Sequence, residues 1–139
     1  MMRGAVIAVV AFAAACGGES AVPRPDVVGG SASRGKVAIT KFGCGGCHVI
    51  PGVPGSVGRV GPSLAGFADR AYVAGSTLNV PDSVIEWIRA PRSMRPNTVM
   101  PAMGVNAHDA RDIVAYLYTL TERRLGAPHL FPVAWLGTH

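Results

Sequence analysis

The residues with the most specific chemistry in this sequence are two cysteines and the histidine that follows the second of them. They form the segment Cys44-Gly45-Gly46-Cys47-His48, whose spacing is that of covalent haem c attachment. Each thiol adds across one haem vinyl group, and two intervening residues let both sulfurs reach vinyls on neighbouring pyrrole rings. His48 then lies beneath the iron and is expected to coordinate it. The motif therefore predicts one covalent haem, held by Cys44 and Cys47.

Two other kinds of site also use closely spaced cysteines. A zinc site needs about four ligands, usually including a second cysteine or histidine pair at short spacing. The remaining histidines, His108, His129 and His139, form no such pair. A thioredoxin-like dithiol follows a strand, whereas residues 33–42 before this motif have a helical pattern. Both alternatives are therefore less well supported than haem.

A sixth iron ligand must come from elsewhere in the chain, and three methionines are candidates. Met94, Met100 and Met103 lie in a proline-rich stretch, residues 91–104, that we expect to form a fixed loop. A rigid loop is able to hold a weak thioether ligand at the iron. His108 is the alternative, although we expect it to be a solvated residue in the first turn of a helix. The residue pattern by itself leaves this choice open.

Local signals predict the first two helices that must position these residues. The first covers about residues 33–42, with Ser33 as its N-cap and Gly43 as its end. The second begins at Pro81, because proline suits the first helical position, and it ends before Pro91. The haem motif therefore follows the first helix directly.

The last helix has the clearest apolar periodicity. Asn106 is its predicted N-cap and Gly126 its predicted end. Residues 49–80 are rich in glycine and proline, so we predict an extended loop there, with room for one short helix. No segment has a convincing strand pattern. The sequence therefore predicts an all-α fold of three to five short helices and long loops around one haem.

Composition and charge limit the function. Lys and Arg outnumber Asp and Glu by 13 to 8, but the charges are scattered along the chain. Nucleic-acid binding needs basic residues concentrated on one face, so we predict no nucleic-acid partner. A basic face that docks an acidic redox partner is an alternative to plain solvation of these charges. A folded region of about 90 residues buries only a modest core, so a large apolar cofactor would complete it.

The N-terminus carries a targeting pattern. Arg3 is followed by a short apolar stretch that ends in three alanines and Cys16. The stretch is too short to span a bilayer, so residues 1–15 are predicted to be a secretory signal peptide of the bacterial lipoprotein type. Cys16 would be acylated, and several acyl chains at one site anchor a protein stably. Ordinary signal cleavage, with Cys16 incidental, is the alternative.

The segment after this pattern is predicted to be a linker. Residues 16–32 are rich in Gly, Ser, Pro and Val without an apolar period, and we predict a flexible linker. The signal predicts a mature protein in the bacterial periplasm, anchored by lipid to a membrane. Haem is attached to apoproteins outside the bacterial cytoplasm, so the signal and the haem motif support each other.

Taken together, these motifs resemble those of class I cytochromes c. The resemblance covers residues 33–125, which we predict to be a cytochrome c domain, and it leaves an apolar tail at 126–139 outside. A narrower resemblance is to the small bacterial cytochromes c that accompany respiratory oxidases. The resemblance rests on ordered motifs: Gly35 in the first helix, the segment 44–48, Gly61-Pro62-Ser63-Leu64, Pro96-Asn97-Thr98-Val99-Met100-Pro101 and Ala115-Tyr116-Leu117.

The resemblance implies roles for five further residues. In this family a proline carbonyl accepts the hydrogen bond of the proximal histidine, and Pro62 matches that proline. Met100 stands where the family has its axial methionine. Thr98 and Arg70 stand at positions that contact haem propionates, and Trp87 stands at an aromatic position that walls the distal pocket. The family's tryptophan at an inner propionate has no obvious counterpart here.

Electron transfer is the function that this resemblance implies. A haem with His and Met ligands has no open iron site and favours a relatively high reduction potential. We therefore expect an electron carrier between respiratory-chain partners, such as an oxidase or reductase complex, with no enzymatic activity and no small-molecule substrate. One alternative is a haem subunit of a membrane oxidase or dehydrogenase complex. Another is a small haem enzyme or gas sensor, which needs a vacant or easily lost sixth ligand.

Overall fold

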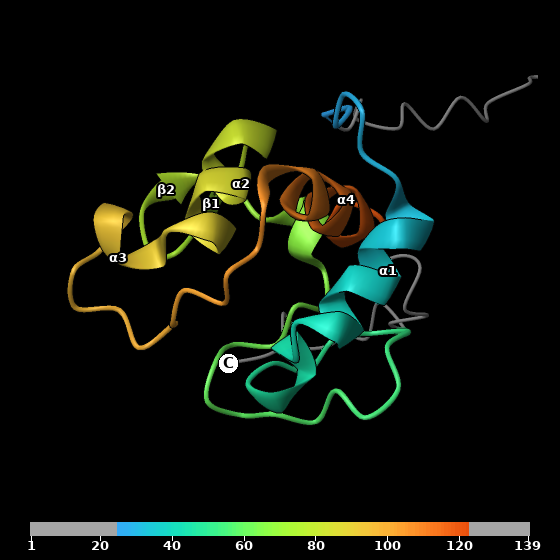
Figure 1. Cartoon of the computed structure of the whole chain (residues 1–139), viewed down its shortest axis with the longest axis horizontal. Helices are drawn as coiled ribbons and strands as arrows, with labels where there is room; N and C mark the ends of the chain where they lie inside the picture. The colour runs from blue at the N-terminus through green and yellow to red at the C-terminus, as the bar shows by residue number, and fades with distance from the viewer. Residues whose placement is uncertain (1–24, 123–139) are drawn as a thin grey trace, which may run out of the picture.

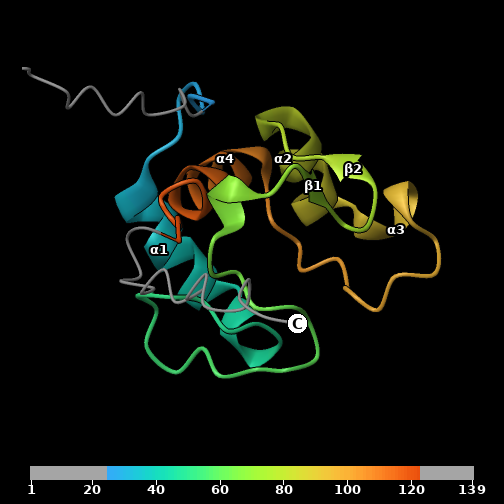
Figure 2. The same ribbon diagram turned by 180° about the vertical axis from the view of Figure 1, so that it is seen from behind.

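The computed structural model describes residues 25–122 of the chain. Its helices are α1 (Ala32–Lys41), α2 (Pro81–Arg89), α3 (Pro91–Met94) and α4 (Ala107–Leu117), and a hairpin pairs β1 (Tyr72–Val73) with β2 (Thr77–Leu78). Helix α4 packs against both α1 and α2. Seen from either side, α1 lies on one flank of α4, and the hairpin, α2 and α3 lie on the other (Figure 1 and Figure 2). The predicted all-α fold of short helices and long loops is confirmed.

Two elements lie where the sequence predicts loops. Strands β1 and β2 pair Tyr72 with Leu78 and Val73 with Thr77, so the prediction of no strands is wrong. Each strand has two residues, which is too short for a visible alternation of apolar and polar side chains. Helix α3 occupies the start of the expected loop at 91–104, because Pro91 takes the first helical position of a new turn.

Helix α1 begins at a different cap from the predicted one. The side chain of Ser31 accepts a hydrogen bond from the backbone N–H of Arg34, so Ser31 is the N-cap, and the prediction of Ser33 is wrong. The end of the helix agrees with the prediction. Gly43 follows the C-cap Phe42 and has φ 68°, a left-handed conformation that glycine adopts without strain.

Helices α1 and α4 cross at Gly35. A Cβ atom there would overlap the backbone carbonyl of Asp112, so the close approach requires glycine. The Asp112 side chain is 2% exposed and accepts from Arg34 Nε at 2.7 Å, Arg34 Nη2 at 2.8 Å and the N–H of Ser31 at 2.7 Å. The hydrogen bonds of Arg34, above all, lower the pKa of Asp112 below its ordinary value. The crossing is thus held by packing and by a charged hydrogen-bond network.

The folded part of the chain begins before residue 32. Val27 is buried, and it belongs to the same core as the helices. At Gly30, an added Cβ would crowd the backbone carbonyl of Arg111 in α4. The predicted flexible linker over 16–32 is therefore too long at its C-terminal end. Residues 1–24, which include the predicted signal peptide and Cys16, lie outside the described residues.

Helix α4 starts as predicted and ends earlier. Asn106 Oδ1 accepts the N–H of Asp109 at 2.9 Å, which confirms the predicted N-cap. The helix ends at Leu117, with Tyr118 as its C-cap, so the prediction that it continues to Gly126 is wrong. Gly126 itself and the tail at 126–139 lie outside the described residues.

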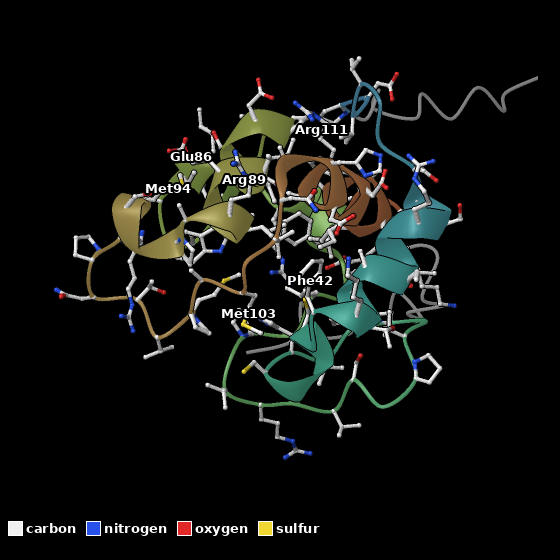
Figure 3. The ribbon with its side chains drawn as sticks, in the orientation of Figure 1. Phe42, Glu86, Arg89, Met94, Met103 and Arg111 are labelled. Atoms are coloured by element: carbon white, nitrogen blue, oxygen red, sulfur yellow. The ribbon has the colours of Figure 1, made fainter. Side chains whose placement is uncertain are left out.

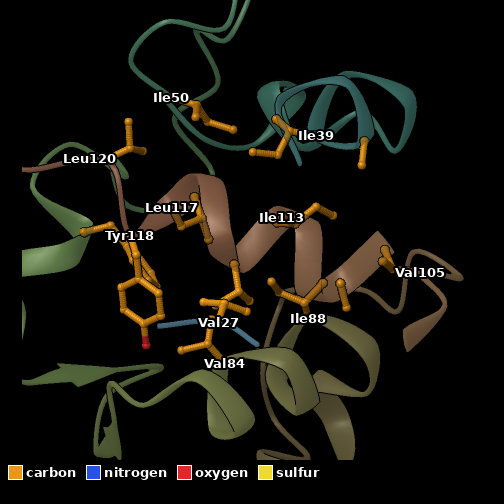
Figure 4. Close-up of a cluster of buried hydrophobic side chains, with 14 of the residues drawn as sticks. Val27, Ile39, Ile50, Val84, Ile88, Val105, Ile113, Leu117, Tyr118 and Leu120 are labelled. Carbon is orange, nitrogen blue, oxygen red and sulfur yellow. The ribbon is translucent and has the colours of Figure 1, made fainter. Parts of the chain in front are cut away.

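One apolar core joins α1, α2 and α4 (Figure 4). Ile39, Val84, Ile88, Ile113 and Leu117 are each at most 7% exposed. Full burial of one such side chain stabilises a fold by about 1.5–3 kcal/mol. The same five residues also line a cavity, so the core is built around a space.

Two tyrosines near the end of α4 fasten the loops to the core. Tyr116 donates its hydroxyl to the carbonyl of Pro51 at 2.7 Å, in the loop after the haem motif. Tyr118 donates to Asn79 Oδ1 at 3.1 Å, and the Asn79 amide donates to the carbonyls of Phe67 and Arg70, both at 2.9 Å. Burial raises the pKa of Tyr118 to about 12, so this donor keeps its proton at neutral pH.

Candidate haem site

The two cysteines and the histidine lie on one tight turn directly after α1. Gly43 redirects the chain, and Cys44–Gly46 form a short 3-10 helix. The N–H groups of Cys47 and His48 both donate to the carbonyl of Cys44, at 3.2 and 3.1 Å. The two sulfurs and the imidazole are therefore presented from one hydrogen-bonded unit.

Both thiols are free and half-buried. Burial raises the pKa of the Cys44 thiol above its ordinary value, with a smaller contribution from Cys47. At neutral pH Cys44 is therefore a protonated thiol, which is less prone to oxidation than a thiolate. Both sulfur-bearing residues line the cavity, where a ligand seated in it would meet them.

The imidazole of His48 is oriented by the backbone of a neighbouring loop. Its Nδ1 lies 2.7 Å from the carbonyl oxygen of Pro62. A carbonyl only accepts, so Nδ1 carries the hydrogen and Nε2 keeps its lone pair for a metal. Gly61 lies flat against the ring, since an added Cβ would overlap it, and the Gly61 N–H donates to the carbonyl of Cys47 at 2.8 Å. In the sequence, Gly61 belongs to a motif but has no predicted role, and its place before Pro62 is the only signal for it.

All eight residues predicted for the haem site line a single cavity. The space inside it, with its open mouth, is about 1310 Å³. The other lining side chains are mostly apolar, and they include the core residues of α1, α2 and α4. Trp87 contributes from α2, beside Val84 and Ile88. The eight predicted residues are Cys44, Cys47, His48, Pro62, Arg70, Trp87, Thr98 and Met100.

The loop between α3 and α4 brings two of the three candidate methionines to this cavity. Met100 and Met103 line it, whereas Met94 is the last residue of α3 and is absent from the lining. In Figure 3, Met94 lies beside α3 and away from Met103. Met100 is partly buried, while Met103 is 42% exposed. Met100 is therefore the more enclosed of the two residues.

Two residues expected at the propionates also bond to the protein itself. Arg70 Nη2 donates to the backbone carbonyls of Ser63 and Ala65, the latter at 2.9 Å. Thr98 Oγ1 accepts the N–H of Met100 at 3.2 Å. Arg70 thus braces the loop that orients the imidazole, and Thr98 braces the chain at Met100. Neither contact is predictable from the sequence, because each depends on how the loops fold.

The lining is poor in charge. His48 and Arg70 are its only histidine and its only fully charged residue, and no carboxylate lines the cavity within the described part of the chain. Across residues 25–122, no group of three or more His, Cys, Asp or Glu is arranged to hold a metal ion. The zinc alternative therefore has no structural support there. The cavity instead suits a large apolar ligand with a metal that His48 coordinates.

Comparison with known proteins identifies the family. Residues 32–121 match the family described as "Cytochrome c", and this match covers more than half of the chain. The chain belongs to the cytochrome c family. The cytochrome is also similar to cytochrome c oxidase subunit 2 of Alkalihalophilus pseudofirmus, with 31% identity over 90 residues. That stretch is 64% of this chain but 25% of the subunit, so the cytochrome spans about a quarter of its relative's length.

Membership of the family implies covalently bound haem c, and the residues of this cytochrome fit that group. The cavity offers two thiols at the required spacing, an imidazole with Nε2 free for iron, and apolar walls. The predicted resemblance to cytochromes c is thereby confirmed.

No helix within residues 25–122 is both long enough and apolar enough to cross a bilayer.

Proposed function

We propose that this cytochrome is a mono-haem electron-transfer protein, with His48 and Met100 as axial ligands, that passes single electrons between respiratory-chain partners. The observation that carries the proposal is the shared cavity. Cys44, Cys47 and Met100 line it together with an imidazole whose Nδ1 is engaged by Pro62. A haem c in this cavity supplies one-electron chemistry at its iron.

The residues around the cavity favour a rigid site with a low reorganisation energy for electron transfer. Pro62 fixes the tautomer and the plane of His48, and raises its basicity as a ligand. The apolar side chains of α1, α2 and α4 exclude water, which favours the less charged form of a buried redox group. A neutral thioether from Met100 favours the reduced iron in the same direction. The site is thus suited to accept and release an electron without binding a substrate.

The relative that matches this chain supports an oxidase as one partner. Its printed name is that of an oxidase subunit, and the similarity extends over 90 residues. We therefore propose that the partners include a respiratory oxidase. The alternative, a haem subunit fixed within such a complex, is supported by the same match, and the two differ in whether the cytochrome dissociates.

A haem enzyme or gas sensor has less support. Chemistry on a bound ligand needs a general acid or base near the iron. Within the described residues, the cavity lining offers no carboxylate and no histidine other than His48. Met100, in a loop pinned by Thr98, would also compete with an added ligand.

The purified haem-loaded protein tests carrier against sensor. The oxidised protein is expected to have the far-red sulfur-to-iron charge-transfer band, and a redox titration should give one single-electron step for one haem. The reduced protein should bind carbon monoxide slowly, because the thioether must leave first. Rapid carbon monoxide binding together with the absence of the band would contradict the carrier and favour the sensor.

We also propose that the cytochrome acts in the bacterial periplasm, anchored through an acylated Cys16 after removal of residues 1–15. The apolar stretch that ends in alanines before Cys16 supports this proposal. Wild-type protein should sediment with membranes, and Cys16→Ser should release it or block processing, since the acyl chains carry the membrane affinity. A wild-type protein that is unlipidated and recovered in the soluble fraction would refute the anchor.

A further inference from the structure

Arg95 lies at the base of the loop that carries the candidate thioether ligand. Its backbone N–H donates to the carbonyl of Pro91 at 2.9 Å, which closes α3, and its carbonyl accepts the N–H of Thr98 at 3.1 Å. Thr98 in turn accepts the N–H of Met100 through its side chain. Two consecutive hydrogen bonds therefore connect Arg95 to Met100 through Thr98, so a displacement of Arg95 would also move Met100.

The side chain of Arg95 reaches a different part of the chain, the turn between β1 and β2. Its Nη2 donates to Ser76 Oγ. The guanidinium lies against the backbone of Gly75, where an added Cβ would be 3.2 Å from both Cζ and Nη2. Gly75 has φ 90° and Ala74 has φ 49°, so this turn is left-handed and presents bare backbone to the arginine. Ala74 itself lines the cavity.

This contact is partly exposed, and no carboxylate among the described residues balances the charge of Arg95. Arg95 Nε is shielded from solvent without a hydrogen-bond partner. Within residues 25–122, no acidic side chain forms an ion pair with Arg95. Arg92, within α3, differs in being exposed and in making no such contact in the described chain. Packing against the turn and the bond to Ser76 therefore hold the guanidinium in place.

We propose that Arg95 is a positioning residue for Met100: it fastens the ligand loop to the β1–β2 turn and so keeps the thioether sulfur at the iron. The proposal rests on the proposed His48 and Met100 ligation. A thioether is a weak ligand, so the fraction of time that Met100 is bound to the iron depends on how rigidly its loop is held. Fastening the base of the loop reduces the conformational freedom that ligation must remove.

Three haem-loaded single variants and one double variant test the proposal. The single variants are Arg95→Ala, Ser76→Asp and, as the matched control, Arg92→Ala. The far-red band is followed on heating, beside far-ultraviolet circular dichroism for global unfolding, and carbon monoxide binding to the reduced protein is timed. Arg95→Ala should lose the band well below its unfolding temperature and bind carbon monoxide roughly tenfold faster, which is the lower end of the range for one hydrogen bond to a charged group. Arg92→Ala should match the wild type.

Ser76→Asp tests the same contact by strengthening it. A carboxylate at this position would pair with the guanidinium, so the band should persist to a higher temperature than in the wild type. The double variant Arg95→Ala/Ser76→Asp should lose this gain, because its partner is absent.

Each result has a defined meaning. Identical behaviour of Arg95→Ala and Arg92→Ala would overturn the proposal, and so would equal shifts of band loss and global unfolding, which mark a merely structural role. A wild-type protein without the band would refute Met100 ligation, and the role of Arg95 with it, before any variant is measured. A band in the wild type with unaltered variants refutes the role of Arg95 alone.

Discussion

Met100→Ala is expected to abolish the far-red sulfur-to-iron charge-transfer band of the oxidised protein and to open the iron to carbon monoxide or cyanide. The thioether is a soft, neutral ligand that stabilises ferrous over ferric iron, so its removal should also lower the reduction potential. Axial ligands span roughly 0.8 V in haem proteins, and the fall should be a clear fraction of that range. Visible spectra and a redox titration measure both effects.

Met103→Ala is the matched control, because Met103 lines the same cavity from the same loop. It should keep the band. Met103 is 42% exposed, so the loss of stability should stay below the roughly 2–5 kcal/mol of a buried methionine. The opposite pattern, with the band kept in Met100→Ala and lost in Met103→Ala, would move the axial ligand to Met103.

Replacing both cysteines, Cys44→Ala with Cys47→Ala, is expected to leave no covalent haem. All haem should then be extractable by acidified organic solvent, because no sulfur remains for a thioether. The fold should lose stability as well, because partly buried apolar residues of the cavity lining, such as Leu64 and Trp87, would lack the haem as a packing partner. Full burial of one such side chain contributes about 1.5–3 kcal/mol, against a total stability of about 5–15 kcal/mol for a typical domain.

The controls for this variant separate attachment from thiol chemistry in general. Cys16→Ser removes the remaining cysteine and should leave the haem covalently bound. Each single replacement, Cys44→Ala or Cys47→Ala, should retain one thioether and resist extraction. Extraction followed by visible spectroscopy and circular dichroism of the apoprotein measures both outcomes. Covalent haem in the double variant would overturn the motif interpretation.

Retention of Met100 and orientation of His48 depend on different loops of this cytochrome. The imidazole is held by the Gly61-Pro62 backbone, which Arg70 braces through the carbonyls of Ser63 and Ala65. The loop that carries Met100 is held by Thr98, which accepts the N–H of Met100, and by Arg95, which donates to Ser76 in the hairpin turn. Substitutions of Thr98 or Arg95 are therefore expected to release Met100 from the iron while His48 stays in place.

The sequence by itself determined the features that depend on short spacing. The Cys-x-x-Cys-His pattern, the start of α2 at Pro81 and the N-cap at Asn106 each arise from residues within one or two turns of chain. Such signals need no knowledge of the rest of the fold. The motifs that resemble those of cytochromes c predicted the remaining site residues, and all eight predicted haem-site residues line one cavity.

Only the tertiary structure decided the features that depend on contacts between distant residues. Ser31 rather than Ser33 caps α1, where the Ser31 N–H also donates to Asp112 on α4. Val27 belongs to the core because α4 passes beside a segment that has no periodicity of its own. The guanidinium of Arg95 contacts the β1–β2 turn, and strands of two residues are too short to predict that turn from the sequence. These choices follow from burial and from pairing of polar groups across the fold, which local sequence does not encode.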